Sequence, residues 1–165
     1  MRIMLVVLAL VISIAAGVFV SRRAPVKDSE QVAPPAIGKL VIQPANYKPS
    51  PSPLSPGILV GDTLYLSGST GGDPVTGQLV AGGFEPEMRQ IFSNVQAVLK
   101  SAEMDLSNVV AVTGYLGDMS DFARYNEIYK EYFKTEPLPT RSTVAVKELA
   151  RGAKIELTMT AVRTK

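Results

Sequence analysis

The stretch FEPEMRQIFSNVQAVLKSAEM, residues 84 to 104, decides the fold because its apolar residues recur at every third or fourth position. That spacing places them on one side of an α-helix, and Pro86 suits the first turn of such a helix. The members of this apolar stripe are Met88, Ile91, Phe92, Val95, Val98, Leu99 and Ala102. A helix with one apolar face needs a partner that covers it, so we expect neighbouring segments to supply a sheet.

Short apolar runs on both sides of this helix are typical of β-strands. The upstream run ILVGDTLYLSGS contains two strands joined by Gly61-Asp62, a hairpin signal, and the downstream run NVVAVTGYL contains a third. A second stripe predicts a second helix, and its members are Phe122, Tyr125, Ile128, Tyr129, Tyr132 and Phe133. Two more strands are predicted at 141–147 and 154–162. The order β-β-α-β-α-β-β predicts an α+β domain with both helices on one sheet face.

The N-terminal part of the chain differs in composition from this domain. Residues 3–20 form one uncharged apolar run, which as a helix would reach roughly 27 Å, enough to cross a bilayer. We therefore predict a signal anchor or signal peptide over 1–21, a proline-rich linker over 22–53 and the folded domain over 54–165. An uncleaved membrane anchor is the favoured interpretation, with the domain on the extracytoplasmic side.

The composition excludes several classes of chemistry. The 165 residues include no histidine and no cysteine, which excludes serine–histidine triads, cysteine nucleophiles and the usual structural zinc sites. The net charge is +2, with no clustered basic run, so a nucleic-acid partner is not expected. Any chemistry must use carboxylates, arginine, lysine, hydroxyls, amides or the backbone.

Alternation along the strands indicates what each sheet face presents. It predicts Val144 towards the helices and Arg141, Thr143 and Glu156 on the opposite face. That opposite face is rich in hydroxyls and poor in charge, which favours a closed homo-oligomer in which another subunit covers it. Arg141 and Glu156 then either line a cleft between subunits or form an ion pair on neighbouring strands, and the spacing leaves both interpretations open.

Four segments resemble the RidA (YjgF) family of enamine/imine deaminases: PLSPGILVGDTLYLSG, MRQIFSNVQAVLKSA, VVAVTGYLGDMSDFARYNEIYKEYF and LPTRSTVAVKELARGAKIELTMTAV. The resemblance runs from about Leu54 to Val162, and the motif P-x-R-S-x-V followed by K-I-E is its most specific part. It implies a chorismate-mutase-like fold and a homotrimer with clefts between subunits. It also implies cofactor-independent hydrolysis of 2-imino acids such as 2-iminopropanoate to 2-keto acids and ammonia.

The resemblance also implies roles for individual residues. Arg141 matches the arginine that grips the substrate carboxylate, and Glu156 matches the glutamate that holds the attacking water and moves protons. The matching substrate-binding positions are Ser67, Gly68, Asn126 and Thr143, the last standing where many members have cysteine. A bidentate, permanently charged guanidinium suits a carboxylate ligand.

Two departures from the family pattern bear on function. Leu54 stands where many deaminating members carry a tyrosine, and GSTGG (68–72) replaces the more usual GQIP. An alternative function is therefore a non-catalytic trimeric module that binds a small carboxylate.

Overall fold

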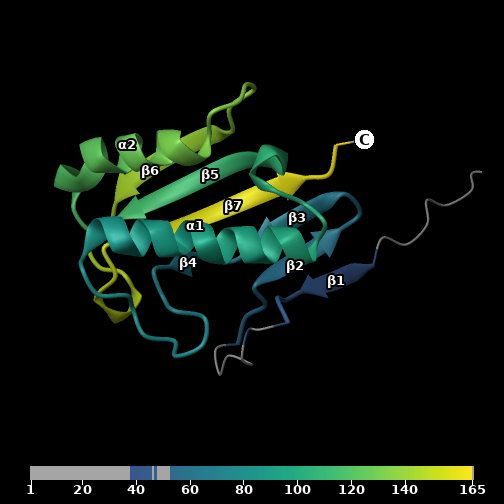
Figure 1. Cartoon of the computed structure of the whole chain (residues 1–165), viewed down its shortest axis with the longest axis horizontal. Helices are drawn as coiled ribbons and strands as arrows, with labels where there is room; N and C mark the ends of the chain where they lie inside the picture. The colour runs from purple at the N-terminus through teal and green to yellow at the C-terminus, as the bar shows by residue number, and fades with distance from the viewer. Residues whose placement is uncertain (1–37, 46, 48–52, 165) are drawn as a thin grey trace, which may run out of the picture. The chain divides into compact units, whose positions relative to one another are not determined.

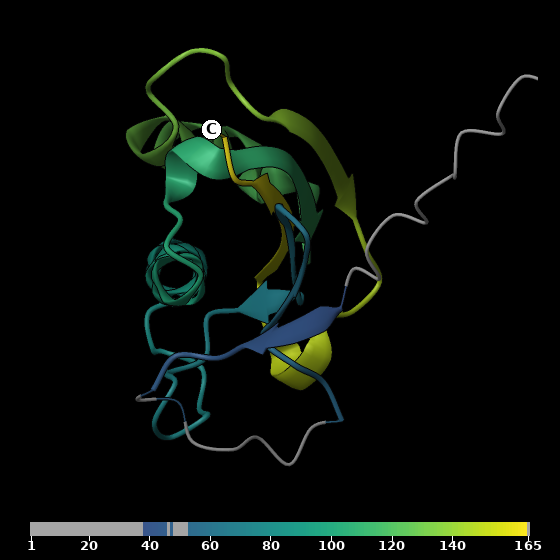
Figure 2. The same ribbon diagram turned by 90° about the vertical axis from the view of Figure 1, so that its right-hand side faces the viewer.

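A computed structural model describes residues 38–45, 47 and 53–164, and Figure 1 shows their arrangement. The strands are β1 (Lys39–Ile42), β2 (Gly57–Val60), β3 (Thr63–Leu66), β4 (Ser69–Thr70), β5 (Val109–Leu116), β6 (Thr140–Ala145) and β7 (Ile155–Val162). The helices are α1 (Phe84–Ser101) and α2 (Phe122–Tyr132), with short 3-10 turns at Leu106–Asn108, Met119–Asp121 and Ala150–Gly152. These elements form a sheet of seven strands with both helices on one face, as Figure 2 shows from the end of α1.

The strand order is β1-β2-β3-β7-β5-β6, and β4 also pairs with β7. β5 and β6 run parallel, whereas the other pairs are antiparallel. β6 is therefore an edge strand of the sheet, and β7 lies in the centre. The pairing of β7 with β3 and then β4 skips one residue: Tyr65 faces Thr160, but Ser69 faces Leu157. One extra residue in the β3–β4 strand is the signature of a β-bulge, and it lies at Ser67–Gly68.

The core lies between α1 and the sheet. All seven members of the α1 stripe are buried, as predicted, and they pack against Leu64 of β3, Leu116 of β5 and Leu157 of β7. Burial of each large apolar side chain contributes about 1.5–3 kcal/mol, so this face of α1 fixes the helix on the sheet.

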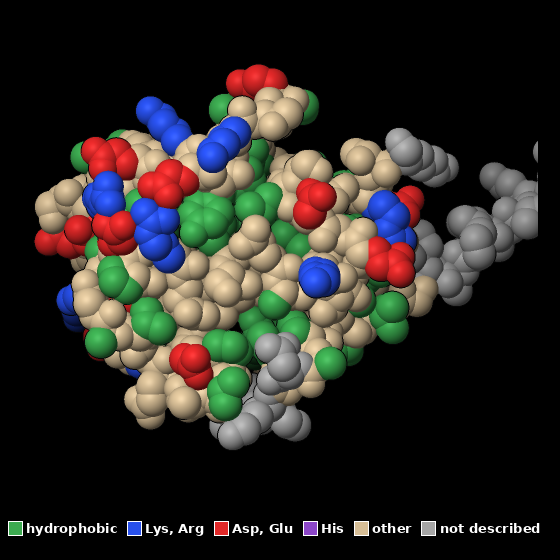
Figure 3. Space-filling model, in the orientation of Figure 1, with side chains coloured by type: hydrophobic (Ala, Val, Ile, Leu, Met, Phe, Trp, Pro, Cys, Tyr) green, Lys and Arg blue, Asp and Glu red, His purple; other side chains and the backbone are tan. Residues whose placement is uncertain are grey.

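The second helix is tied to the first by charge as well as by packing. Arg89 of α1 donates to both carboxylate oxygens of Glu131 in α2, at 2.8 and 3.1 Å, and Arg124 of α2 contacts Glu85 of α1. Figure 3 shows acidic and basic side chains gathered over α2 and the start of α1. These groups are exposed, so the network orients α2 more than it stabilises the protein.

Two strands were not in the predicted order. β1 forms from the short run KLVI, and the two-residue β4 follows the bulge. Neither has the length or the periodicity that identifies a strand from sequence alone.

The prediction that the fold includes a membrane-spanning segment is wrong. Within the described residues no helix is long and apolar enough to cross a membrane. A span needs about 20 mostly apolar residues; α2 has 11, and the 18 of α1 include acidic residues in the first turn and Lys100 in the last. The run 3–20, from which the anchor was inferred, lies outside the described residues. The membrane-anchored or exported localisation inferred from that run is withdrawn with the anchor.

Candidate functional site

Arg141 lies on β6 and points to the helix-covered side of the sheet. Its register partner is Val112 of β5, a buried core residue, and the carbon of its guanidinium lies 4.8 Å from the ring centre of Tyr125 and 4.6 Å from that of Tyr129. Its Nη2 donates to Asn126 Oδ1 at 2.6 Å. Two aromatic rings and an amide of α2 therefore hold the guanidinium in one direction.

This orientation corrects the sequence-based prediction, which placed Arg141 on the opposite face with Glu156. Register pairs share a face, and Val144, predicted to point towards the helices, pairs with Tyr115 and is 47% exposed. The predicted alternation along β6 is wrong by one residue, because it takes Val144 as the residue that faces the core. On β6 the core side is instead covered by the aromatic rings of α2.

The cation of Arg141 is available to a ligand. The residue is exposed, and no carboxylate of the described part of the chain forms an ion pair with it. The rings beneath it are neutral, since burial raises the pKa of the Tyr125 hydroxyl and raises that of Tyr129 to about 12. Both hydroxyls are buried, and neither has a hydrogen-bond partner among the described residues. Thr143 lies two residues along β6 on the same face, beside Gly114. We call Arg141, Asn126 and Thr143 the arginine half-site.

Glu156 lies on the opposite face of the sheet, beside the β-bulge. It pairs with Tyr115 on one side and with Thr70 of β4 on the other. Its carboxylate rests against Gly68: a Cβ built on that glycine would lie 2.0 Å from Glu156 Oε1. Only glycine at this position leaves room for the carboxylate. The neighbouring Ser67 is held by its backbone N–H to Pro56 O, at 3.0 Å, and its hydroxyl donates to Ser55 O at 2.6 Å. We call Glu156, Ser67 and Gly68 the glutamate half-site.

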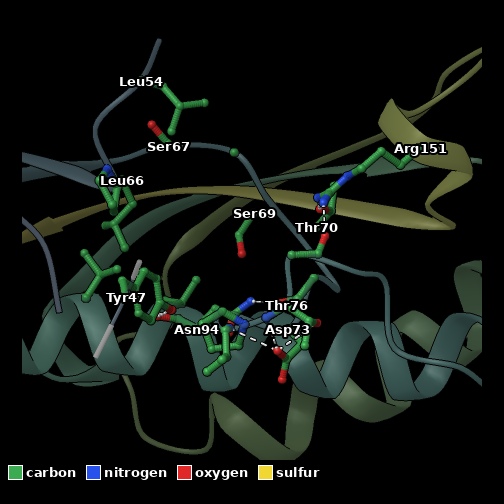
Figure 4. Close-up of a pocket in the computed structure, with 18 residues that line it drawn as sticks. Tyr47, Leu54, Leu66, Ser67, Ser69, Thr70, Asp73, Thr76, Asn94 and Arg151 are labelled. Carbon is green, nitrogen blue, oxygen red and sulfur yellow. Dashed lines mark hydrogen bonds between the residues drawn. The ribbon is translucent and has the colours of Figure 1, made fainter. Parts of the chain in front are cut away.

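A cavity of about 420 Å³ adjoins the glutamate half-site, between β4, α1 and the loop 72–77. Figure 4 shows Leu54 and Ser67 at one end, Ser69 in the middle and Arg151 with Thr70 at the other. Leu66, Val95 and Val98 supply apolar wall, and Gly68 also belongs to the lining. The cavity therefore combines an apolar wall with polar groups in its middle as well as at its ends.

The structure brings the predicted residues together as two groups, not one. Arg141, Asn126 and Thr143 lie on the helix side of β6 or on α2, whereas Glu156 lies on the other face of β7, with β5 between the two strands. The predicted alternative of an ion pair on neighbouring strands is therefore excluded. Among the described residues no group of three or more acidic side chains has the arrangement of a metal site.

Sequence reasoning missed the supports of both half-sites. The helical spacing of Tyr125 and Tyr129 predicts that they are buried in the core. It does not show whether their rings contact an aliphatic side chain or a guanidinium. Arg151 was not singled out at all. Its signal in the sequence is Gly152, because a glycine before a strand favours a tight turn with positive φ, and Gly152 has φ 74°.

The sequence matches a family model and several curated proteins. A family model described as Endoribonuclease L-PSP matches residues 46–163. The chain is similar to the 2-iminobutanoate/2-iminopropanoate deaminase of Homo sapiens, with 42% identity over 123 residues that cover 74% of this chain and 89% of the human protein. The protein of the same name from Mus musculus is 44% identical over 111 residues, covering 67% of this chain and 82% of the mouse protein.

Solved structures share the fold. The Rid-family protein YyfA of Yersinia pestis, whose function is described as unknown, superposes with a TM-score of 0.72 at 34% identity, covering 76% of this chain and all of that one. E. coli TdcF, solved with bound serine, gives a TM-score of 0.69 at 29% identity, covering 76% of this chain and 99% of TdcF.

Proposed function

The chain belongs to the RidA (YjgF) family, and from that membership we propose that it is a deaminase that hydrolyses 2-imino acids such as 2-iminopropanoate to 2-keto acids and ammonia. The named deaminases at 38–44% identity support this activity. The observation that carries it in the structure is Arg141, an exposed cation held in a fixed direction by two rings and an amide.

Arg141 binds the carboxylate of the substrate in this proposal. Its guanidinium offers two parallel N–H groups to the two carboxylate oxygens. Because Asn126, Tyr125 and Tyr129 already fix the guanidinium, little side-chain entropy is lost when the substrate binds. The imine carbon is thereby held in one position relative to the rest of the cleft.

Glu156 acts as the general base for the attacking water. Its carboxylate accepts a proton from water as the oxygen bonds to C2 of the imine, and the imine nitrogen takes up a proton. The tetrahedral intermediate then loses ammonia, and C2 becomes the carbonyl carbon of the 2-keto acid. Such general acid–base help contributes roughly 10²–10⁴-fold. Gly68 leaves the space in which this carboxylate lies.

The cleft forms between two copies of the chain. One chain places its arginine and glutamate half-sites on opposite faces of the sheet, so a small substrate that touches both requires the arginine half-site of one subunit and the glutamate half-site of the next. A contact between two unlike patches forms a ring where its rotation closes, and family resemblance indicates a ring of three. The exposed Tyr65 and Val144 lie on the face that the next subunit would cover.

The activity is tested with 2-iminopropanoate generated in situ from alanine by an amino-acid oxidase, with semicarbazide as the trap for free imine. The protein should slow semicarbazone formation, and Arg141→Ala should lose about 10²-fold or more in kcat/KM, since both charge-assisted hydrogen bonds are removed. A variant with normal activity would remove Arg141 from the mechanism.

The shared cleft is tested by mixing two inactive variants. Arg141→Ala and Glu156→Gln are unfolded together and refolded, so that subunits assort at random. A composite cleft has both residues intact in about a quarter of cases, and about a quarter of the wild-type activity should return. No recovery from mixed oligomers, checked by light scattering, would place each site within one chain.

A carboxylate-binding module without catalysis is the alternative, and Leu54 favours it. This side chain lines the cavity beside Ser67 and supplies no hydroxyl there. In that case small carboxylates would raise the melting temperature of the protein, but imine hydrolysis would stay at the uncatalysed rate.

A further inference from the structure

Arg151 has an unusual backbone conformation. It lies in the 3-10 turn directly before β7 with φ 60° and ψ 17°, and Gly152 follows with φ 74°. Positive φ is uncommon for a residue with a side chain and persists where the surrounding structure enforces it. The turn carries the arginine side chain back over β4.

The guanidinium of Arg151 is fixed at the edge of the glutamate half-site. Its Nη2 donates to Thr70 Oγ1 at 2.9 Å and its Nη1 donates to the carbonyl oxygen of Gly77. Thr70 is the register partner of Glu156, so Arg151 is held by the residue directly beside the proposed catalytic carboxylate. Figure 4 shows this contact at the end of the cavity.

The charge of Arg151 is not neutralised within the described part of the chain. None of the ion pairs found there involves it, and only two of its five N–H groups are used in the hydrogen bonds above. Asp73 also lines the cavity, but its Oδ1 accepts from Val75 N, Thr76 N and Thr76 Oγ1 within its own turn. Arg151 is therefore a second cation available to a ligand in this cavity.

We propose that Arg151 binds a carboxylate on the side chain of the substrate, so that the preferred substrates are 2-imino dicarboxylates. This inference rests on the proposed function. The C1 carboxylate lies on Arg141 of one subunit, the imine carbon lies beside Glu156 of the next, and the side chain extends past Thr70, the register partner of Glu156, to Arg151. Two arginines also offset the repulsion between a dianionic substrate and Glu156.

The reaction itself is unchanged. Water adds to C2, the C=N bond is replaced by C=O, and nitrogen leaves as ammonia. 2-Iminosuccinate gives oxaloacetate, and its second carboxylate takes no part in bond making. A cavity of about 420 Å³ is larger than the methyl group of 2-iminopropanoate requires.

The test compares 2-iminosuccinate and 2-iminopropanoate, each generated in situ from its amino acid by an oxidase, in wild type and Arg151→Gln. The readout is the ratio of kcat/KM for the dicarboxylate to that for the monocarboxylate. Loss of a charge-assisted contact should lower this ratio about 10-fold or more. The matched control is Arg163→Gln, which removes the same charge just beyond the other end of β7, where Arg163 donates to Ala102 O. Its ratio should stay at the wild-type value.

Each other outcome has one meaning. If Arg151→Gln leaves the ratio unchanged, or if wild type accelerates only the hydrolysis of 2-iminopropanoate, the inference is overturned and the proposed function stands. If neither imine is hydrolysed faster than without protein, the proposed function fails as well. Should Arg151→Gln not fold, Arg151→Lys replaces it, and an intermediate ratio supports the inference while an unchanged ratio overturns it.

Discussion

The two half-sites are built in different ways. In the arginine half-site, side chains do the positioning: a long charged group on an edge strand is held by two rings and an amide from α2. In the glutamate half-site, the backbone does it: a bulge in the β3–β4 strand puts a glycine against the carboxylate of Glu156. The arginine half-site should therefore tolerate substitutions that keep an aromatic ring beneath Arg141. The glutamate half-site should tolerate no added atom at Gly68.

The sharpest test of this difference is Gly68→Ala. The added methyl group would lie 2.0 Å from Glu156 Oε1, so the carboxylate must move. A misplaced base loses most of its effect, and we expect kcat to fall by roughly 10²-fold, near the loss for Glu156→Gln. The measurement is steady-state kinetics with 2-iminopropanoate.

The control for this variant is Gly38→Ala, because a Cβ built there meets nothing within 4 Å. It should retain full activity. If Gly68→Ala were equally active, the bulge would not be what positions Glu156, and the contrast between the half-sites would be lost.

A smaller effect is expected from Tyr129 in the other half-site. Tyr129→Leu removes one face of the cation–π contact, worth about 0.5–2 kcal/mol, and should raise KM roughly 2- to 30-fold with little change in kcat. Tyr129→Phe keeps the ring and removes a buried hydroxyl that has no hydrogen-bond partner in the described part of the chain, so KM and stability should stay close to wild type. Equal losses in both variants would show that the hydroxyl, and not the ring, supports Arg141.

The smallest effect concerns alkaline pH. Burial raises the pKa of Tyr129 to about 12, so the folded state favours the protonated hydroxyl. The stability that the protonated Tyr129 hydroxyl gives the folded state is fully present below the ordinary tyrosine pKa near 10, and it is lost as pH rises towards 12. Wild type should lose up to about 1 kcal/mol more unfolding free energy than Tyr129→Phe between pH 8 and pH 11. Urea denaturation at both pH values measures it, and parallel losses would contradict the assignment.

The same contrast explains what could be predicted from sequence. The α1 stripe was identified in full because a helix packed on a sheet obeys one period along its length. The face of β6 was misassigned, because at an edge strand the partner is a group of aromatic rings from α2 and not an aliphatic core. Strand alternation singled out Arg141 and Glu156, and family resemblance gave them roles, but their placement on opposite faces was not foreseen. The bulge at Ser67–Gly68 depends on pairing with β7, which lies about 90 residues further along the chain.

The central position of β7 has a consequence for how the protein is made. β3 and β5 pair with β7 and not with each other, so β1–β2–β3 and β5–β6 remain separate sheets until residues 155–162 are present. In the part of the chain that the structure describes, both helices and six strands precede that segment. A nascent chain that stops before Ile155 exposes two unpaired strand edges and the apolar face of α1, which are the features that chaperones and proteases recognise. Quality control in the cell should therefore discriminate sharply between a chain that has just acquired β7 and one that is a few residues short of it.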